Sequence, residues 1–317
     1  MIQDPGKLTE AASGVYIISA TPFTQTGAID FDSADRLVEF YLDKGVTGMT
    51  ILGMMGEAPK LSGEESHAFM AHMIARVNGR VPVVVGVSNP GITNMAALSH
   101  AAMDAGAAGV MIAPQRGLAT DEKHYGYFAQ CFKALGPDIP VCYQDFPLST
   151  GVSISAALFT RLVQDFDQLV MLKHEDWPGL NKLSAVRRSA EEAGARRVSI
   201  LCGNGGIFLP EEMQRGADGA MTGFAYPEML VDVVRLSQAG EEDRASDIFD
   251  AYLPLIRFEQ QPGFGLAIRK EILRRRGALA CNAARAPGPK LTEADRAEIT
   301  RLMERLEARL RELDDGS

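Results

Sequence analysis

Short apolar runs rich in Val and Ile alternate along most of the chain with longer amphipathic segments of helical period. Eight of the apolar runs predict strands, at residues 15–20, 48–52, 81–87, 109–113, 141–145, 169–173, 198–202 and 219–222. Seven amphipathic segments between them predict helices, at residues 33–44, 62–78, 93–105, 121–135, 154–164, 180–193 and 211–216. This alternation is typical of a parallel sheet, because parallel strands need a long crossover connection, usually a helix.

Eight such strand and helix units favour a closed barrel. The rival, an open doubly wound sheet, usually has a glycine-rich turn after its first strand, whereas the turn here reads Ala-Thr-Pro-Phe. We therefore predict an α/β fold in which residues 1–238 form a (β/α)8 TIM barrel. Beyond this point the strand pattern ends and three helical segments follow, at 243–259, 265–275 and 292–313. Residues 239–317 are thus expected to form a C-terminal helical extension.

Composition narrows the classes of partner. The chain has 317 residues, 46% of them apolar, and a formal net charge of −9 with no basic stripe, which argues against binding to nucleic acid. No apolar stretch approaches the roughly 18 residues of a membrane span, and the polar N-terminus does not resemble a signal peptide, so we expect a cytoplasmic protein without membrane contact. The four cysteines are widely spaced and no zinc-binding motif is present, which predicts reduced cysteines and no metal.

One lysine stands at the end of a predicted strand. Of nine lysines, only Lys173 closes an apolar run, Leu-Val-Met-Leu-Lys, whereas the others fall in the tail or on helices and loops. Active groups of a (β/α)8 barrel stand at the carboxyl ends of its strands. Because desolvation disfavours the ammonium form, Lys173 is a candidate amine nucleophile for a ketone. The alternative is a buried structural ion pair with Glu175 or Asp176.

A tyrosine stands near the end of the preceding strand. Adjacent strand ends of a barrel approach each other, so Tyr143 is a candidate proton carrier for an imine on Lys173. Taken by itself, Tyr143 would be an aromatic residue that fills the barrel.

Two glycine-rich turns follow the second and seventh strands. They read Gly53-Met54-Met55-Gly56-Glu57 and Gly203-Asn204-Gly205-Gly206. Backbone N–H groups in such turns can hold a small carboxylate, although either turn would also serve as a plain structural loop.

Together these residues resemble the dihydrodipicolinate synthase and N-acetylneuraminate lyase family of pyruvate-type class I aldolases, over nearly the whole chain. The turn after the second strand, with Leu61 and Glu64, is similar to the family's carboxylate-binding loop. Tyr143 falls at its catalytic tyrosine, Lys173 at its Schiff-base lysine, and residues 203–206 at the glycine turn after its seventh strand. The resemblance implies an imine between Lys173 and a 2-keto acid, chemistry without a metal or organic cofactor, and a homo-oligomer, either a dimer or a tetramer.

Departures from the family pattern bear on the substrate. Family members of the synthase type carry two threonines where this chain has Met54 and Met55, and an arginine where it has Ser149. Other segments are more similar to the 2-keto-3-deoxy sugar acid dehydratases, namely Gln144-Asp145, Lys173-His174-Glu175, Pro178-Gly179 and residues 219–223 around Met221.

We therefore expect a lyase in which Lys173 forms an imine with a 2-keto acid and Tyr143 carries protons. Asp145 and Glu175 are the expected acidic helpers, and backbone N–H groups around Gly56 and in residues 203–205 are expected to hold the carboxylate. The expected substrate-binding residues are Gly53, Met54, Met55, Gly56, Glu57, Asp145, Glu175, Gly203, Gly205 and Met221.

Lysine chemistry alone leaves several reactions open. Loss of a C4 hydroxyl gives a dehydratase and cleavage of the C3–C4 bond gives an aldolase, and these two on a 2-keto-3-deoxy sugar acid are favoured. Addition of the enamine to an aldehyde gives a dihydrodipicolinate synthase. A further alternative is a barrel that has lost catalysis and only binds a ligand, which the two methionines in the carboxylate loop suggest.

Overall fold

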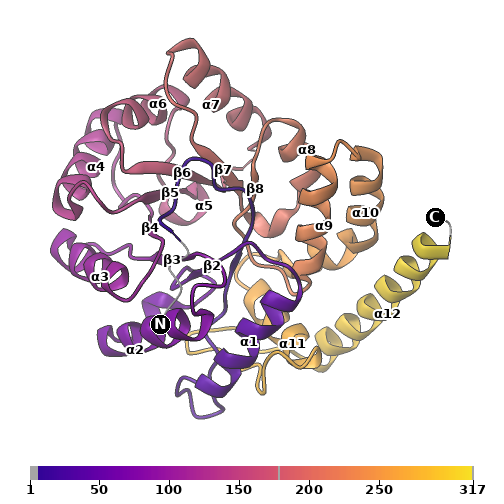
Figure 1. Cartoon of the computed structure of the whole chain (residues 1–317). Coiled ribbons are helices and arrows are strands. Elements are labelled where there is room, and N and C mark those ends of the chain that lie inside the picture. The colour runs from indigo at the N-terminus through magenta and orange to yellow at the C-terminus, as the bar shows by residue number, and fades with distance from the viewer. Residues whose placement is uncertain (1–5, 178, 316–317) are drawn as a thin grey trace.

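A closed barrel of eight parallel strands forms the centre of the molecule in a computed structural model that describes residues 6–177 and 179–315 (Figure 1). The strands are β1 (Gly14–Ile18), β2 (Gly48–Ile51), β3 (Val83–Gly86), β4 (Gly109–Ile112), β5 (Val141–Asp145), β6 (Leu169–His174), β7 (Ser199–Cys202) and β8 (Gly219–Ala220). Each pairs with the next and β8 pairs with β1, which confirms the predicted TIM barrel. Three parts of the predictions lie outside the described residues. They are residues 1–5 at the start of the predicted barrel domain, Pro178 of the dehydratase-like motif, and residues 316–317 at the end of the predicted extension.

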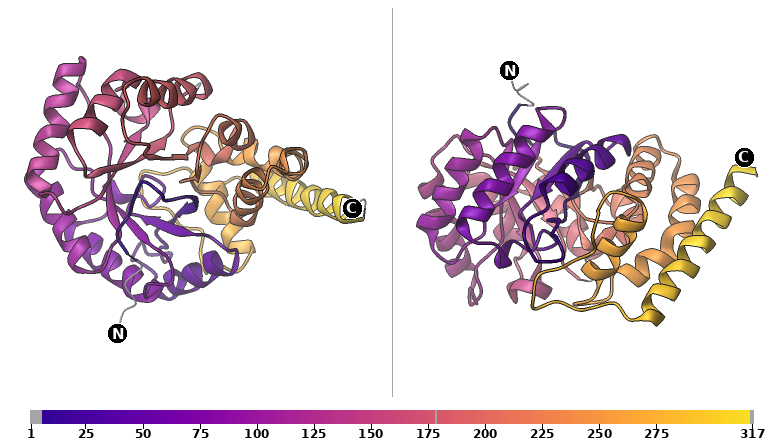
Figure 2. Two further views of the ribbon diagram at one scale, coloured as in Figure 1. Left: turned by 45° about the horizontal axis from the view of Figure 1, so that its top comes forward. Right: turned by 90° about the horizontal axis from the view of Figure 1, so that it is seen from below.

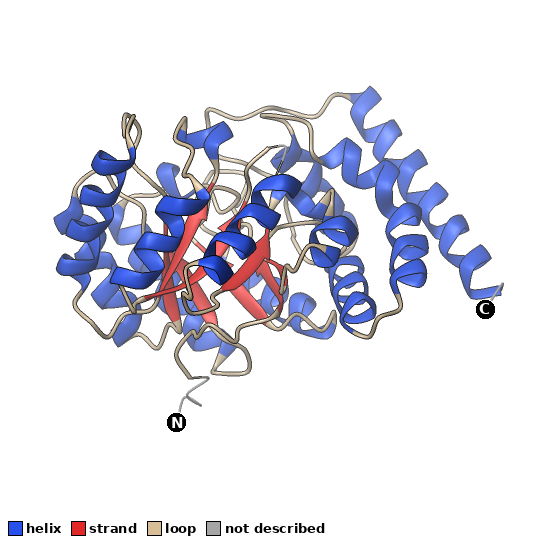
Figure 3. Cartoon of the chain, turned by 90° about the horizontal axis from the view of Figure 1, so that it is seen from above, coloured by secondary structure: helices blue, strands red, loops and turns tan. Residues whose placement is uncertain are grey.

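Helices surround the strands (Figure 3). The barrel helices are α1 (Phe31–Asp43), α2 (Gly63–Val77), α3 (Ile92–Asp104), α4 (Asp121–Leu135), α6 (Ala156–Asp165), α7 (Leu180–Glu192), α8 (Leu209–Gln214) and α9 (Pro227–Gln238). Three short helices follow strand ends: η1 (Ala58–Lys60), α5 (Pro147–Thr150) and η2 (Asn204–Gly206). The eighth strand was predicted at 219–222 and β8 lies within it, whereas helix α9 was not among the predicted helices.

Polar caps determine where several of these helices begin. The side chains of Asp30, Ser62, Thr120 and Ser155 each accept a hydrogen bond from the backbone N–H three residues on, at the start of α1, α2, α4 and α6. In α2 the Glu65 side chain returns a bond to the backbone of Ser62, which completes a capping box.

Two separate apolar clusters result from the alternation of side chains along the strands. One cluster fills the barrel and includes Tyr16, Ile18, Val84, Met111, Cys142, Met171, Leu201 and Met221. The larger one lies between the strands and the surrounding helices and includes the strand residues Val15, Ile17, Met49, Ile51, Val85, Val110, Tyr143, Leu172 and Ile200. Because neighbouring residues of a strand point to opposite sides, the cluster to which a side chain belongs shows whether it faces the barrel interior.

Three helices follow the barrel: α10 (Glu242–Glu259), α11 (Gly265–Arg275) and α12 (Glu293–Asp315). Helix α10 packs against α8, α9 and α12. Figure 2 shows α12 at the edge of the molecule, with its C-terminal end directed away from the barrel. Its buried residues are Ile299, Leu302 and Leu306. Among the helices of the described residues, none is long and apolar enough to cross a bilayer.

Glu212 of α8 is a buried carboxyl group that should make stability depend on pH. Burial raises its pKa from 4.5 to about 8, and a bond with the Cys202 thiol opposes this only in part. The folded protein therefore keeps a proton that the unfolded chain releases near pH 4.5. We expect the free energy of unfolding to fall, by up to about 1.4 kcal/mol per pH unit, as the pH rises from about 4.5 to about 8.

Urea denaturation of Glu212→Gln across this pH range tests the expectation. The variant should lose that part of the slope and gain stability relative to the wild type as the pH rises. Exposed Glu191 of α7 offers the matched control, because Glu191→Gln should leave the slope unchanged. Parallel curves for Glu212→Gln and the wild type would show that Glu212 is ionised in the folded protein.

Candidate active site

Lys173 enters the barrel near the carboxyl end of β6. It is paired in register with Gln144 of β5 and Leu201 of β7, and it follows Met171 by two residues, so it faces the interior. The side chain is buried, with a residue exposure of 4%, and its Nζ lies 2.7 Å from Oε1 of Glu175. Gln144 Nε2 donates to the same oxygen at 2.8 Å. An amine, a carboxylate and an amide thus share one hydrogen-bonding group.

Glu175 is held firmly beside the lysine. Its backbone N–H donates to the carbonyl of Asp145 at 2.9 Å, and its own carbonyl accepts from Nδ2 of Asn204 at 3.2 Å. A Cβ atom at Gly203 would lie 2.1 Å from Cγ of Glu175, so only glycine leaves room for this side chain. The structure therefore brings together two residues predicted for the site, Lys173 and Glu175, and gives Gly203 a steric role.

The prediction that Tyr143 stands beside Lys173 is wrong. Tyr143 belongs to the cluster outside the barrel, where its ring packs against Phe128 and Phe159. Its hydroxyl pairs with Nε2 of His124 at 2.7 Å, and burial raises its pKa well above the usual value. The physical reason is the two-residue alternation of a strand, which turns Tyr143 away when its neighbour Gln144 faces the interior.

Tyr143→Phe tests this placement. The change removes one buried hydroxyl and its bond to His124, so we expect a modest loss of stability, about 1 kcal/mol. Turnover should stay within about threefold of the wild type, because a group behind the sheet has no access to the substrate. Steady-state kinetics measure the effect, and a fall of a hundredfold or more would restore Tyr143 as a proton carrier.

Asp145 also lies behind the sheet, so its predicted role as an acidic helper at Lys173 is wrong. It is fully buried, with Oδ2 2.7 Å from Nζ of Lys182 and 3.9 Å from Nδ1 of His174. Burial raises the pKa of Asp145 to about 6, and the charge of Lys182 opposes this. Lys182 also pairs with Asp176 at 2.8 Å, which ties the turn after β6 to β5.

The loop after β2 lies at the barrel mouth and contains five of the predicted residues. Gly53 lies against the side chains of Ile18 and Met111, and Met55 packs on the interior cluster. Met54 is 40% exposed, and its sulfur accepts a hydrogen bond from Oγ of Ser149 at 3.0 Å.

Glu57, the last residue of this motif, was predicted to bind substrate, and this is wrong. Its buried carboxylate turns away from the barrel mouth toward Lys60 and Lys270. No local pattern predicts this contact, because Lys270 is separated from Glu57 by 213 residues.

Three of the N–H groups predicted to hold a carboxylate are already bonded within the protein, so that part of the prediction is wrong. Gly56 donates to Gly53, Gly203 donates to His174, and Gly205 donates to Oγ1 of Thr222. In the part of the chain that the structure describes, the backbone N–H groups of Met54 and Met55 make no bond to a protein acceptor.

The remaining predicted residues, Gly205 and Met221, pack against other parts of the protein. A Cβ atom at Gly205 would lie 1.8 Å from Nε2 of Gln260, so this glycine admits the end of α10. Met221 fills the barrel interior, with its sulfur 3.9 Å from Sγ of Cys142.

Gln144 contacts Glu175 in the site but was not among the predicted site residues. A signal for it existed, because Cys142 and Gln144 alternate along β5 as Met171 and Lys173 do along β6. Only the register between the strands shows which alternate set faces inward.

The barrel, with a buried lysine and carboxylate at the end of β6, defines a class I lyase of the (β/α)8 type. The model of the dihydrodipicolinate synthetase family matches residues 11–306, and the chain belongs to this family. The predicted family and the predicted lyase class are confirmed.

Individual relatives carry two kinds of name. The chain is 30% identical over 298 residues to an L-2-keto-3-deoxyarabonate dehydratase of Azospirillum brasilense, covering 93% of this chain and 94% of that protein. It is 32% identical over 310 residues to a 4-hydroxy-tetrahydrodipicolinate synthase of Sorangium cellulosum, covering 94% and 97%. A crystal structure described as dihydrodipicolinate synthase from Rhodopseudomonas palustris is 50% identical, with a TM-score of 0.92 over 95% of this chain and 99% of that one.

Proposed function

We propose that this protein is a dehydratase of a 2-keto-3-deoxy sugar acid that works through an imine on Lys173. The observation that carries the proposal is the buried group of Lys173, Glu175 and Gln144 at the barrel mouth. A nucleophilic amine with a carboxylate 2.7 Å away has both the group that forms an imine and the group that moves its protons. Similarity to the arabonate-type dehydratase supports the choice of substrate class.

The reaction follows from these groups. The free amine of Lys173 adds to C2 of the substrate. The former carbonyl oxygen leaves as water with one proton from the amine and one taken up from solvent, which leaves a protonated imine, and the final hydrolysis returns that proton to solvent. Glu175 removes a proton from C3, and the C–H electron pair moves into the imine to form an enamine. The enamine electrons then expel the C4 hydroxyl, which leaves as water with the proton that Glu175 returns. Hydrolysis of the unsaturated imine restores Lys173 and releases a product lighter than the substrate by one water.

The substrate carboxylate would bind the loop after β2. The N–H groups of Met54 and Met55 lie in a turn at the mouth and have no acceptor among the described residues. Backbone N–H groups bind a carboxylate regardless of the side chains that they carry. The methionines that replace the threonines of the synthases are compatible with this part of the site.

The synthase is the second candidate, and the 50% identical structure with that description favours it. Against it, the inward position beside Lys173 holds the amide of Gln144, and the loop carries Met54 and Met55. The hydroxyl of Tyr143, at the position of the family's catalytic tyrosine, lies behind the sheet, and the two methionines replace the two threonines of the synthases, one of which belongs to their proton relay.

Product analysis separates the candidates. Purified protein is incubated with 2-keto-3-deoxy acids of five and six carbons and, separately, with pyruvate and an aldehyde. We expect a product lighter by one water from at least one of the sugar acids. Release of pyruvate and an aldehyde would instead indicate an aldolase, and condensation of pyruvate with the aldehyde a synthase.

The family resemblance also supports a homo-oligomer, and we include a dimer or tetramer in the proposal. Light scattering after gel filtration measures the mass, and a monomer at micromolar concentration would contradict it.

A further inference from the structure

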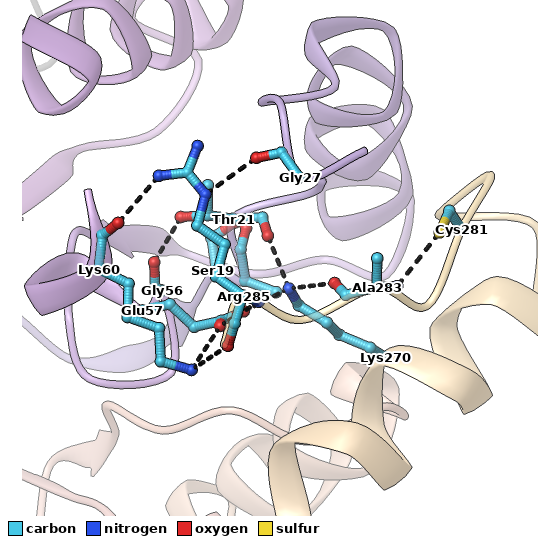
Figure 4. A network of polar contacts seen from close by, with 11 residues as sticks. Ser19, Thr21, Gly27, Gly56, Glu57, Lys60, Lys270, Cys281, Ala283 and Arg285 are labelled. Atoms are coloured by element: carbon cyan, nitrogen blue, oxygen red, sulfur yellow. Dashed lines mark hydrogen bonds and ion pairs between the residues drawn. The ribbon is translucent and has the colours of Figure 1, made fainter. Parts of the chain in front are cut away.

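Lys270 of α11 is a second buried lysine, and its ammonium group meets Glu57 at the end of the loop after β2 (Figure 4). Its residue exposure is 0%. Its Nζ donates to Oε1 of Glu57 at 2.5 Å and to the carbonyls of Thr21 and Ala283, each at 2.9 Å. An ammonium group has three donors and all of them are used. Lys270 is thus a bound cation with no free position for a substrate.

Glu57 receives two further donors on its other oxygen. Nζ of Lys60 lies 2.9 Å and the backbone N–H of Arg285 lies 3.0 Å from Oε2. The Arg285 side chain in turn donates to the carbonyls of Gly27 and Lys60, both at 2.9 Å (Figure 4). We call Glu57 with Lys60, Lys270 and Arg285 the Glu57 anchor. Two of these four residues, Lys270 and Arg285, belong to the C-terminal extension.

The loop that the anchor holds has an unfavourable backbone. Leu52 and Glu57, at its two ends, both have φ of 54°, in the left-handed region that residues with a Cβ atom rarely adopt. The Leu52 carbonyl passes over β3, where a Cβ atom at Gly86 would lie 2.4 Å from it. Thr21 Oγ1 donates to the carbonyl of Gly56 at 2.6 Å. Such a conformation persists only where neighbouring contacts determine it, and strain of this kind is typical of ligand-binding sites.

The free N–H groups of the loop lie between its two strained ends. Met54 and Met55 stand between Leu52 and Glu57, so the conformation that Glu57 maintains also sets the direction of these N–H groups. An arrangement meant only to fasten α11 to the barrel would not require left-handed residues at both ends of this turn.

We propose that the Glu57 anchor positions the substrate-carboxylate loop, so that Lys270 and Arg285 of the C-terminal extension act as positioning residues for substrate recognition. The inference rests on the proposed function, because it takes the N–H groups of Met54 and Met55 as the donors to the substrate carboxylate. It assigns to the extension a direct influence on the affinity of the active site for 2-keto acids.

A matched pair of ligands tests this inference. Pyruvate and its neutral analogue pyruvamide are each trapped on the protein with sodium borohydride at subsaturating concentration, and the adduct at Lys173 is followed by mass spectrometry. Hydride adds to the imine carbon and gives a stable secondary amine. The wild type should react faster with pyruvate, because only pyruvate presents a carboxylate to the loop.

Two variants weaken the anchor. Glu57→Gln keeps the shape but turns an NH2 group toward the donors of the anchor, and Lys270→Met removes the central cation. In both we expect the trapping rate with pyruvate to fall about tenfold, as for the loss of hydrogen bonds to a charged group. The rate with pyruvamide should fall less than about threefold, and KM should rise more than kcat falls.

Arg274→Met is the matched control, because it removes a cation from the same helix that is 41% exposed and pairs with Glu271 outside the anchor. Its ratio of the two rates should equal that of the wild type. Three results would overturn this inference and leave the proposed function standing. They are equal losses with both ligands, an unchanged ratio in folded variants, and failure of both anchor variants to fold. If only Lys270→Met fails to fold, Glu57→Gln decides. Absence of any Lys173 adduct in the wild type would instead remove the proposed function, and the inference with it.

Discussion

Replacement of Lys173 by arginine is expected to abolish both imine formation and turnover while the protein remains folded. Arginine keeps a positive charge that can pair with Glu175, but its guanidinium group stays protonated and forms no imine with a ketone. We expect kcat to fall by at least about 10⁴-fold, as for other enzymes that lose their nucleophile. Steady-state kinetics measure the loss of turnover, and circular dichroism shows whether the variant is folded.

Lys182 provides the control for this substitution. It also stands near the end of β6 in space, but it pairs with Asp145 and Asp176 behind the sheet. Lys182→Arg should therefore keep kcat within about threefold. Turnover by Lys173→Arg within about tenfold of the wild type would mean that the reaction does not use this amine.

Glu175→Gln is expected to separate imine formation from proton transfer. The amide keeps the size of the side chain but cannot accept a proton from C3, so kcat should fall by about 10²- to 10⁴-fold. Exchange of the methyl protons of pyruvate in heavy water, followed by nuclear magnetic resonance, should slow by a similar factor, because exchange requires the enamine. Borohydride should still trap pyruvate on Lys173 at long reaction times.

The neighbouring carboxylate serves as the reference. Asp176 follows Glu175 directly but pairs with Lys182, so Asp176→Asn should change the exchange rate by less than about fivefold. If Glu175→Gln exchanged methyl protons as fast as the wild type, the proton acceptor would be another group.

The fold and the nucleophile could be predicted from the sequence because each leaves a local signal. Eight apolar runs separated by helical segments indicate the barrel, and Lys173 is the one lysine at the end of such a run. Only half of the last unit was predicted: the strand at 219–222 contains β8, but the helix α9 after it was not predicted.

The partners of Lys173 depend on information that is not local. Tyr143 and Gln144 are adjacent, and a shift of one residue in the inward set exchanges a phenol for an amide. The register of β5 against β6 determines which of the two residues faces the interior. That register results from packing over the whole barrel.

Glu57 shows the same limit over a longer distance. Its place in a glycine-rich turn indicates a binding loop, but its partners Lys270 and Arg285 come from the far end of the chain. The alternation of polar and apolar residues carries no sign of such a contact.

The measurement that tests the role of Lys173 most directly is intact mass after borohydride reduction in the presence of pyruvate, followed by peptide mapping. We expect a single reduced adduct, located on Lys173 and absent from Lys173→Arg. An adduct on Lys182 or Lys270, or no adduct in protein shown to be folded, would contradict the assignment of Lys173 as the imine-forming residue.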